Sequence, residues 1–208
     1  MDGRDIILLH GKPGSGKSSC LRAATPAIER GTSRSVHHLS VGEYLRSIAQ
    51  GLIKSEFSDN IIANSSDLGQ NKHLPHELVN AVVAECIASS NPAGVIVIDG
   101  YPKYEEQIPV LKNNASVLGA KILAITQVVV PDEVSLERIT SRGLRQGESK
   151  VSIDTARERL IDHSKFAQNT TNVLASAYPY VEVNGNQSFN SVVEELGQAV
   201  IAVLTNKS

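Results

Sequence analysis

A glycine-rich segment near the start of the chain has the spacing of a phosphate-binding loop. Gly11, Gly16, Lys17 and Ser18 fit the pattern G-x-x-x-x-G-K-[ST], between an apolar run at 5–10 and the start of a predicted helix. Glycines let backbone N–H groups converge on a polyphosphate, and the N-terminus of the following helix adds a favourable field. In such a loop Lys17 reaches the β- and γ-phosphates and Ser18 is a ligand of Mg²⁺. The residues expected to form this phosphate site are Gly11, Pro13, Gly14, Ser15, Gly16, Lys17, Ser18 and Ser19.

A carboxylate closes a second apolar run, 95–99, which reads Val-Ile-Val-Ile-Asp. Such a continuous run is typical of a parallel strand that is covered on both faces. A carboxylate at the end of a strand beside a P-loop can hold the hydration shell of Mg²⁺, so we expect Asp99 to do this. An aspartate at a strand end can also simply begin a turn. The position of Asp99 alone leaves both interpretations open.

The elements that would position these residues alternate between strands and helices. Strands are predicted at 5–10, 35–39, 95–99, 122–130 and 180–183, and helices at 41–50, 75–89, 104–118, 132–142, 153–178 and 189–204. Pro26 is expected to kink or end the first helix, which follows the P-loop. The alternation predicts an α/β fold with a parallel central sheet. Because the carboxyl ends of parallel strands meet at one edge, Gly11, Ser40 and Asp99 should lie close together.

Composition narrows the class of protein. The chain has 208 residues, 41% of them apolar, which suits one domain with its own core. A net charge of −2 favours neither nucleic acid nor an anionic membrane as a partner. Two cysteines form no disulfide framework, the six histidines form no metal set, and no run approaches about 18 apolar residues. We expect a cytoplasmic monomer that neither spans a membrane nor binds nucleic acid.

Five further segments, in order along the chain, resemble the sequence motifs of adenylate kinases. The segments are 38–46 (similar to H-L-S-T-G-D-L-L-R), 74–79 (V-P-D-E-L-V), 99–107 (D-G-[FY]-P-R-x-x-x-Q), 138–143 (R-x-x-x-R-G) and 157–160, which resembles the helix leaving the lid of that family. With the P-loop, these matches extend from about 6 to 186. Five ordered motifs are far more specific than a P-loop alone, so the chain resembles the nucleoside monophosphate (NMP) kinase family.

The resemblance implies both a fold and an activity. The fold is the three-layer P-loop kinase type, a central parallel sheet flanked by helices, within a single domain. Its core would comprise 1–39, 75–142 and 152–208, with an NMP-binding helical insertion at 40–74 and a short lid at 143–151. The activity is reversible phosphoryl transfer from MgATP to a nucleoside monophosphate. Such transfer requires aligned phosphates, neutralised charge and exclusion of water.

The resemblance also assigns residues to each substrate. Beyond the P-loop, ATP would contact Arg138, near its base or the lid hinge, and Asn186. The catalytic cations would be Lys17, Arg142, Arg159 and Lys103, although an arginine on a solvated helix face can instead pair with Glu137 or Glu158. The NMP would contact Ser40, Val41, Arg46, Leu74, Gly100, Lys103 and Gln107. Gln107 favours AMP, because adenine-specific members of the family carry Gln there.

Three departures from the family pattern leave alternatives open. Lys103 replaces an arginine, and an ammonium cannot grip phosphate with two parallel hydrogen bonds as a guanidinium does. Val41 replaces the usual threonine. The lid lacks G-R-x-D-D, with Glu148 and Lys150-Val151 near the expected positions and Arg145 as a displaced substitute. The alternatives are a UMP/CMP or other NMP kinase, or a nucleotide-binding module with little transferase activity.

Overall fold

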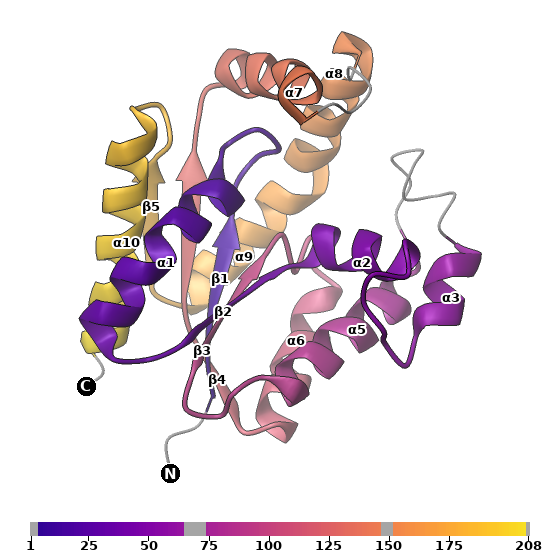
Figure 1. The fold of residues 1–208 in the computed structure, drawn as a ribbon, viewed down its shortest axis with the longest axis vertical. Coiled ribbons are helices and arrows are strands. Elements are labelled where there is room, and N and C mark those ends of the chain that lie inside the picture. Colours follow the sequence, from indigo (N-terminus) through magenta and orange to yellow (C-terminus); the bar gives the residue numbers. More distant parts are fainter. Residues whose placement is uncertain (1–3, 65–73, 147–151, 207–208) are drawn as a thin grey trace.

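Five parallel strands form one sheet in the order β2-β3-β1-β4-β5 (Figure 1). The computed structural model describes residues 4–64, 74–146 and 152–206. The strands are β1 (Arg4–His10), β2 (Val36–Ser40), β3 (Val95–Asp99), β4 (Ala120–Val129) and β5 (Tyr180–Asn184). Every predicted strand is present, with its ends shifted by at most two residues. The predicted parallel α/β class is therefore confirmed.

Helices cover both faces of the sheet. The helices are α1 (Lys17–Thr32), α2 (Val41–Ala49), α3 (Ser58–Ala63), α5 (His76–Ser89), α6 (Gln107–Val117), α7 (Asp132–Gln146), α8 (Ile153–Asp162), the π-helix η1 (His163–Ala167), α9 (Gln168–Ala177) and α10 (Phe189–Thr205). Helices α1 and α10 lie on one face, whereas α5, α6 and α9 lie on the other (Figure 1). The three layers predicted from the sequence are thus present.

The core explains why the central strands read as continuous apolar runs. On β1, Ile6 and Leu8 pack into one buried cluster, and Ile7 and Leu9 pack into a second cluster on the opposite face. All five residues of β3 are buried, with Ile96 and Ile98 in the first cluster and Val95 and Val97 in the second. Successive side chains of a strand point to opposite faces, so a strand with helices on both sides must be apolar at nearly every position.

Helix α1 continues through Pro26, so of the two expected outcomes, a kink or an end, the end of the helix at this proline is wrong. A proline inside a helix removes one hydrogen bond and costs roughly 3 kcal/mol. Packing opposes that cost, because Leu21, Ala24 and Ile28 of α1 are fully buried against the core. Gly197 of α10 lies opposite Ala24, and a Cβ there would be in ordinary van der Waals contact, 3.6 Å from the Cβ of Ala24.

Two other helices differ from their predicted bounds. Helix α7 runs to Gln146, so residues 143–146, the predicted start of the lid, continue that helix. The remaining lid residues, 147–151, lie outside the described residues. The long helix predicted at 153–178 is present but contains the π-helical turn η1. No helix in the described part of the chain is both long enough and apolar enough to cross a bilayer.

The strand register brings the predicted site to one edge of the sheet. Asp99 pairs with Leu9 of β1 and with Ser40 of β2, so the ends of three strands meet there. Gly11 directly follows β1 at the same edge. Figure 1 shows α7 and α8 beyond this edge, with α2 beside it. The fold therefore gathers the P-loop, Asp99 and the predicted NMP-binding insertion around one region.

Candidate active site

The P-loop takes its shape from three glycines with positive φ. Gly11, Gly14 and Gly16 have φ values of 143°, 81° and 87°, a region that other residues rarely adopt. Space is also limiting, because a Cβ on Gly11 would lie 2.6 Å from the carbonyl oxygen of Val128. A Cβ on Gly14 would lie 2.6 Å from the carbonyl oxygen of Ser135. The loop thus passes directly against the end of β4 and the start of α7.

The N-terminus of α1 opens onto this loop. Helix α1 starts at Lys17, and its N-cap Gly16 has no side chain to occupy the N–H groups of the first turn. Those groups are the ones that bind phosphate in such loops. Arg138 supports the loop from α7, since its guanidinium donates to the carbonyl oxygens of Ser15 (3.3 Å) and Gly185 (3.2 Å). Arg138 therefore ties the P-loop to the segment after β5.

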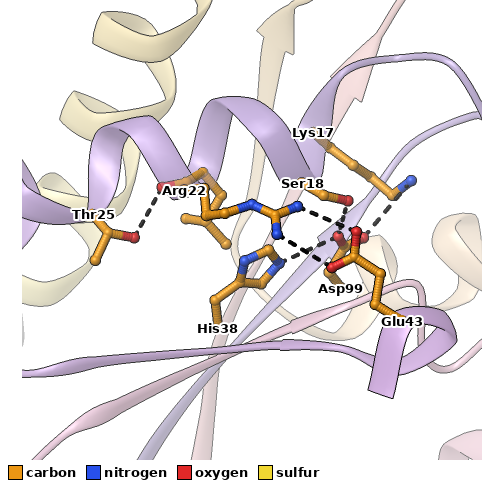
Figure 2. Close-up of polar contacts among 8 residues, drawn as sticks. Lys17, Ser18, Arg22, Thr25, His38, Glu43 and Asp99 are labelled. Atoms are coloured by element: carbon orange, nitrogen blue, oxygen red, sulfur yellow. Dashed lines mark hydrogen bonds and ion pairs between the residues drawn. The ribbon is translucent and has the colours of Figure 1, made fainter. Parts of the chain in front are cut away.

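Asp99 is buried beneath the P-loop and is contacted by three donors (Figure 2). The Lys17 Nζ lies 3.7 Å from Asp99 Oδ1, the Ser18 hydroxyl donates to Oδ2, and His38 Nε2 lies 3.3 Å from Oδ2. Burial alone would raise the pKa of Asp99. The Lys17 charge and the hydrogen bonds from His38 and Ser18 outweigh burial, so the pKa of Asp99 is lowered below its usual value. The carboxylate is therefore ionised at neutral pH.

This arrangement fits a Mg²⁺ ion that is bound together with a nucleotide. A hydroxyl and an ionised carboxylate are the oxygen ligands that Mg²⁺ prefers, and they stand side by side as Ser18 and Asp99. Within the described residues, no group of three or more His, Cys, Asp and Glu side chains could hold a metal ion. The ion would thus take its other ligands from phosphates and water, as Mg²⁺ commonly does in ATP sites.

One cavity of about 810 Å³ joins the P-loop to the predicted acceptor side. The predicted nucleotide-binding residues that line it are Gly11, Pro13, Lys17, Val41, Arg46, Leu74, Gly100, Lys103, Gln107 and Arg159. They come from the P-loop, α2, the segment just before α5, the loop after β3, the start of α6, and α8. A cavity of this size lies within the range of ligand sites in proteins. Lys17 and the acceptor candidates therefore face the same space.

The other predicted site residues lie around the cavity rather than on its wall. Gly14, Ser15, Gly16, Ser18 and Ser19 complete the P-loop and the first turn of α1, and Ser40 and Asp99 end β2 and β3. Asn186 is exposed beside Gly185, at the loop that Arg138 contacts. The side chain of Arg142, in α7, lies outside the described residues.

The cavity cations differ in their partners. The Lys103 Nζ lies 2.5 Å from Asp162 Oδ2, at the end of α8. Arg46 is exposed on α2, and its guanidinium lies over Gly42, where a Cβ would be 3.4 Å from Nη1. The structure gives Arg46 no carboxylate partner within the described residues. Arg46 is therefore the predicted acceptor cation that is most available to a phosphate.

Gln107 is only 2% exposed, and it supports the loop that carries Lys103. Its side-chain oxygen accepts hydrogen bonds from the backbone N–H groups of Lys103 (2.8 Å) and Tyr104 (3.1 Å). A carbonyl oxygen has two lone pairs, so these two bonds use its capacity. The amide N–H groups are what Gln107 has left for a ligand in the cavity.

Two buried histidines on the cavity wall were not predicted as site residues. His10 Nδ1 lies 2.7 Å from the hydroxyl of Thr171, which donates its own proton to the carbonyl oxygen of Ala167. With Thr171 donating to Ala167, His10 donates from Nδ1, and its buried Nε2 makes no hydrogen bond of normal geometry within the described residues. His163 Nδ1 is likewise buried without a described partner. The position of His10 directly before the P-loop was a usable signal, whereas the sequence gives none for His163.

Both histidines are neutral at physiological pH. Burial lowers the pKa of His10 to about 4; a hydrogen bond with the backbone of Tyr101 opposes this shift, and the positive charge of Lys17 adds to it. Burial and the same ammonium lower the pKa of His163 to about 4. Protonating either ring would place a new charge beside Lys17 in a buried position, which is unfavourable. The histidines thus shape the cavity without adding to its positive charge.

An aromatic wall closes the acceptor side. The rings of His76 and Tyr104 are stacked with centroids 4.3 Å apart, and Phe166 lies 5.1 Å from Tyr104. All three line the cavity and come from α5, the loop before α6, and η1. Offset aromatic contacts of this kind stabilise the segments that they join. Sequence motifs gave no indication of this wall, because its members are far apart in the chain.

Comparisons with known proteins agree with this geometry. A family model described as an AAA domain matches residues 10–159. The adenylate kinase of Helicobacter pylori strain Shi470 is 24% identical over 205 residues, which are 96% of this chain and 98% of that protein. The adenylate kinase of Micrococcus luteus is 24% identical over 197 residues, 95% of this chain and 91% of its own. That of Bacteroides fragilis strain YCH46 is 23% identical over 202 residues, 93% and 97% respectively. The chain therefore belongs to the AAA-domain family, and its similarity to proteins named adenylate kinase extends over nearly its whole length.

Proposed function

We propose that this chain is a nucleoside monophosphate kinase that transfers the γ-phosphoryl group of MgATP reversibly to AMP. The observation that carries the proposal is the undivided cavity, which the P-loop Lys17 shares with Arg46, Lys103 and Gln107. The relatives named adenylate kinase match nearly the whole chain, which supports the same class of phosphotransferase.

The donor side would work by electrostatics. Backbone N–H groups of the P-loop and the start of α1 would hold the phosphates of ATP, with Lys17 at the β- and γ-phosphates. Ser18 and ionised Asp99 would hold Mg²⁺, which supplies further neutralisation of phosphate charge when it is bound. Arg138 and Asn186 belong to the proposed ATP site. Arg138 would also support the P-loop through its hydrogen bond to the carbonyl oxygen of Ser15.

The acceptor side would fix the second phosphate. Arg46 and Lys103 would bind the phosphate of AMP, and Arg159 and Arg142 would neutralise charge on the phosphoryl group in transit. Gly100 and Leu74 would pack on the adenine, while Gln107 donates to its edge. Phosphoryl transfer requires little covalent chemistry from the protein, so positioning and neutralisation would account for most of the rate enhancement.

The remaining expectations form part of the same proposal. We place the enzyme in the cytoplasm as a monomer; the free, buried Cys20 and Cys86 suit a reducing compartment. Sedimentation at several protein concentrations tests the monomer. A concentration-dependent increase in mass would contradict it.

The test is a coupled assay with MgATP and each of AMP, CMP, UMP and GMP. We expect ADP production with AMP at the highest kcat/KM, and loss of at least a hundredfold in Lys17→Met. Lys112→Met, on the exposed side of α6, is the matched control and should retain the activity. A higher kcat/KM with CMP or UMP than with AMP would show that a pyrimidine nucleotide, and not AMP, is the acceptor. ATP binding without turnover on any acceptor would reject the kinase in favour of a nucleotide-binding module.

A further inference from the structure

His38 contacts the buried Asp99 from a different element than the other two donors do. Lys17 and Ser18 begin α1, whereas His38 lies on β2 and approaches Asp99 from the side of the sheet (Figure 2). The His38 side chain is 11% exposed, and its Nε2 lies 3.3 Å from Asp99 Oδ2. Strand β2 is held to β3 by parallel pairing along all five residues, from Val36 with Val95 to Ser40 with Asp99. The imidazole is therefore presented by a fixed part of the core.

The proton that joins the two groups is defined by the carboxylate. Ionised Asp99 can only accept hydrogen bonds, so the N–H group must be on Nε2 of His38. The Ser18 hydroxyl donates to the same oxygen, Oδ2, and Lys17 faces Oδ1. A carboxylate that is 3% exposed requires such donors, because an unpaired buried charge is strongly unfavourable.

Binding of MgATP would change the tasks of two of these three donors. In the proposed function Lys17 turns to the phosphates and Ser18 becomes a ligand of Mg²⁺. His38 has neither task, since it does not line the cavity and its strand precedes the acceptor helix α2. It would thus be the donor that continues to hold Asp99 when the other two are engaged.

We propose that His38 is a positioning residue that holds the Asp99 carboxylate in the orientation needed for the hydration shell of Mg²⁺. The inference rests on the proposed ATP site. It goes beyond that site because it assigns a role in metal affinity to a side chain that contacts neither nucleotide. The expected signature is a selective loss of Mg²⁺-dependent ATP binding, with metal-free ATP binding preserved.

The chain offers a matched set of variants. His38→Leu keeps similar volume but has no donor, whereas His38→Gln keeps an N–H donor of similar reach. His37 is the adjacent residue on the same strand; its side chain is exposed and points to the opposite face, so His37→Leu is the control for effects on β2 itself. His38→Ala repeats the test without the bulk of leucine.

The experiment measures ATP affinity by calorimetry with Mg²⁺ and with EDTA, and uses no turnover. We expect His38→Leu and His38→Ala to reduce the Mg²⁺-dependent gain in affinity by about tenfold or more, with affinity in EDTA within about twofold of the unmodified protein. His38→Gln and His37→Leu should retain most of the gain. In an Asp99→Asn background the substitution His38→Leu should have little further effect, because the carboxylate that it positions is gone.

Two results would overturn the inference. One is an undiminished Mg²⁺-dependent gain in both His38→Leu and His38→Ala. The other is an equal loss of affinity with Mg²⁺ and with EDTA, which would show a general structural role instead. The two proposals can fail separately. If the His38 variants lose Mg²⁺-dependent ATP affinity selectively while the unmodified protein phosphorylates no acceptor, the kinase proposal is disproved and the role of His38 is retained.

Discussion

Lys103 and Asp162 form an ion pair across the cavity wall, with 2.5 Å between Nζ and Oδ2. Lys103 follows β3, and Asp162 is the last residue of α8, so the pair joins the loop after the central sheet to the helix that carries Arg159. An acceptor phosphate that binds Lys103 would have to share the ammonium with this carboxylate. The pair therefore gives a physical basis for the first prediction.

Lys103→Arg should lower the KM for the acceptor, raise kcat, or both, by roughly three- to tenfold. A guanidinium presents several donors in a plane, so it can contact Asp162 and a phosphate at the same time. Steady-state kinetics with AMP as the varied substrate measure the effect. Lys112→Arg on α6 controls for the exchange itself. Unchanged KM and kcat in Lys103→Arg would show that the ammonium is not limiting.

Gln107 is expected to have two separable tasks, which Gln107→Glu and Gln107→Met distinguish. At pH 8 a glutamate keeps an oxygen for the N–H groups of Lys103 and Tyr104 but removes the amide donor. Its AMP kcat/KM should fall by about tenfold with little change in melting temperature. Methionine removes both functions, and two unsatisfied N–H groups should destabilise the fold by about 1–3 kcal/mol each. Equal melting temperatures for the two variants would contradict this division.

The stability of the fold should fall as the pH falls from about 6.5 to about 4. The pKa values of His10 and His163 are lowered from 6.5 to about 4 in the folded protein, so in this window the unfolded chain binds more protons. Each ring should cost on the order of 3 kcal/mol of stability by pH 4. Denaturant unfolding at a series of pH values tests this, and His10→Leu should remove no more than about half of the slope, because His163 and His37 also have lowered pKa values. A flat profile between pH 7 and pH 5 would refute it.

Gly14→Ala should damage the P-loop more than the same change at Gly51 does. Both residues have positive φ, 81° and 71°, so each alanine should cost about 1–2 kcal/mol of backbone energy. Only at Gly14 would the new Cβ meet backbone, 2.6 Å from the carbonyl oxygen of Ser135, whereas nothing lies within 4 Å at Gly51. We expect Gly14→Ala alone to weaken ATP binding, measured by titration. If Gly14→Ala and Gly51→Ala changed ATP affinity equally, the close approach of Gly14 to the backbone of Ser135 would not matter for ATP binding.

The sequence predicted the features that depend on local pattern. The apolar runs of β1 and β3 predicted buried parallel strands. A strand whose two faces are both covered by helices has no solvent-facing side chains, so nearly all of its residues are apolar. The alternation of strands and helices predicted that Gly11, Ser40 and Asp99 would lie at one edge of the sheet, and the strand register places them there. Periodicity could not show that Pro26 would be tolerated, since the packing of α1 on α10 is a property of the assembled core.

Features that depend on long-range contacts were not predictable from the sequence. The pairing of Lys103 with Asp162 depends on where α8 ends, and the π-helical turn η1 that follows it has no signal in the sequence. Gln107 was expected to contact a base. The sequence could not show that its side-chain oxygen accepts hydrogen bonds from the backbone N–H groups of Lys103 and Tyr104, because these bonds depend on the conformation of the turn at Lys103. The base contact itself stays a prediction. His163 lies on the wall only because a distant helix passes the P-loop.

The undivided cavity has a stereochemical consequence. Because donor and acceptor would occupy one chamber, the phosphoryl group can pass between them in a single displacement, which inverts the configuration at phosphorus. An ATP analogue made chiral with oxygen isotopes and sulfur at its γ-phosphorus should therefore yield a product of opposite handedness. Two successive displacements through a side chain of the enzyme would instead preserve the original handedness.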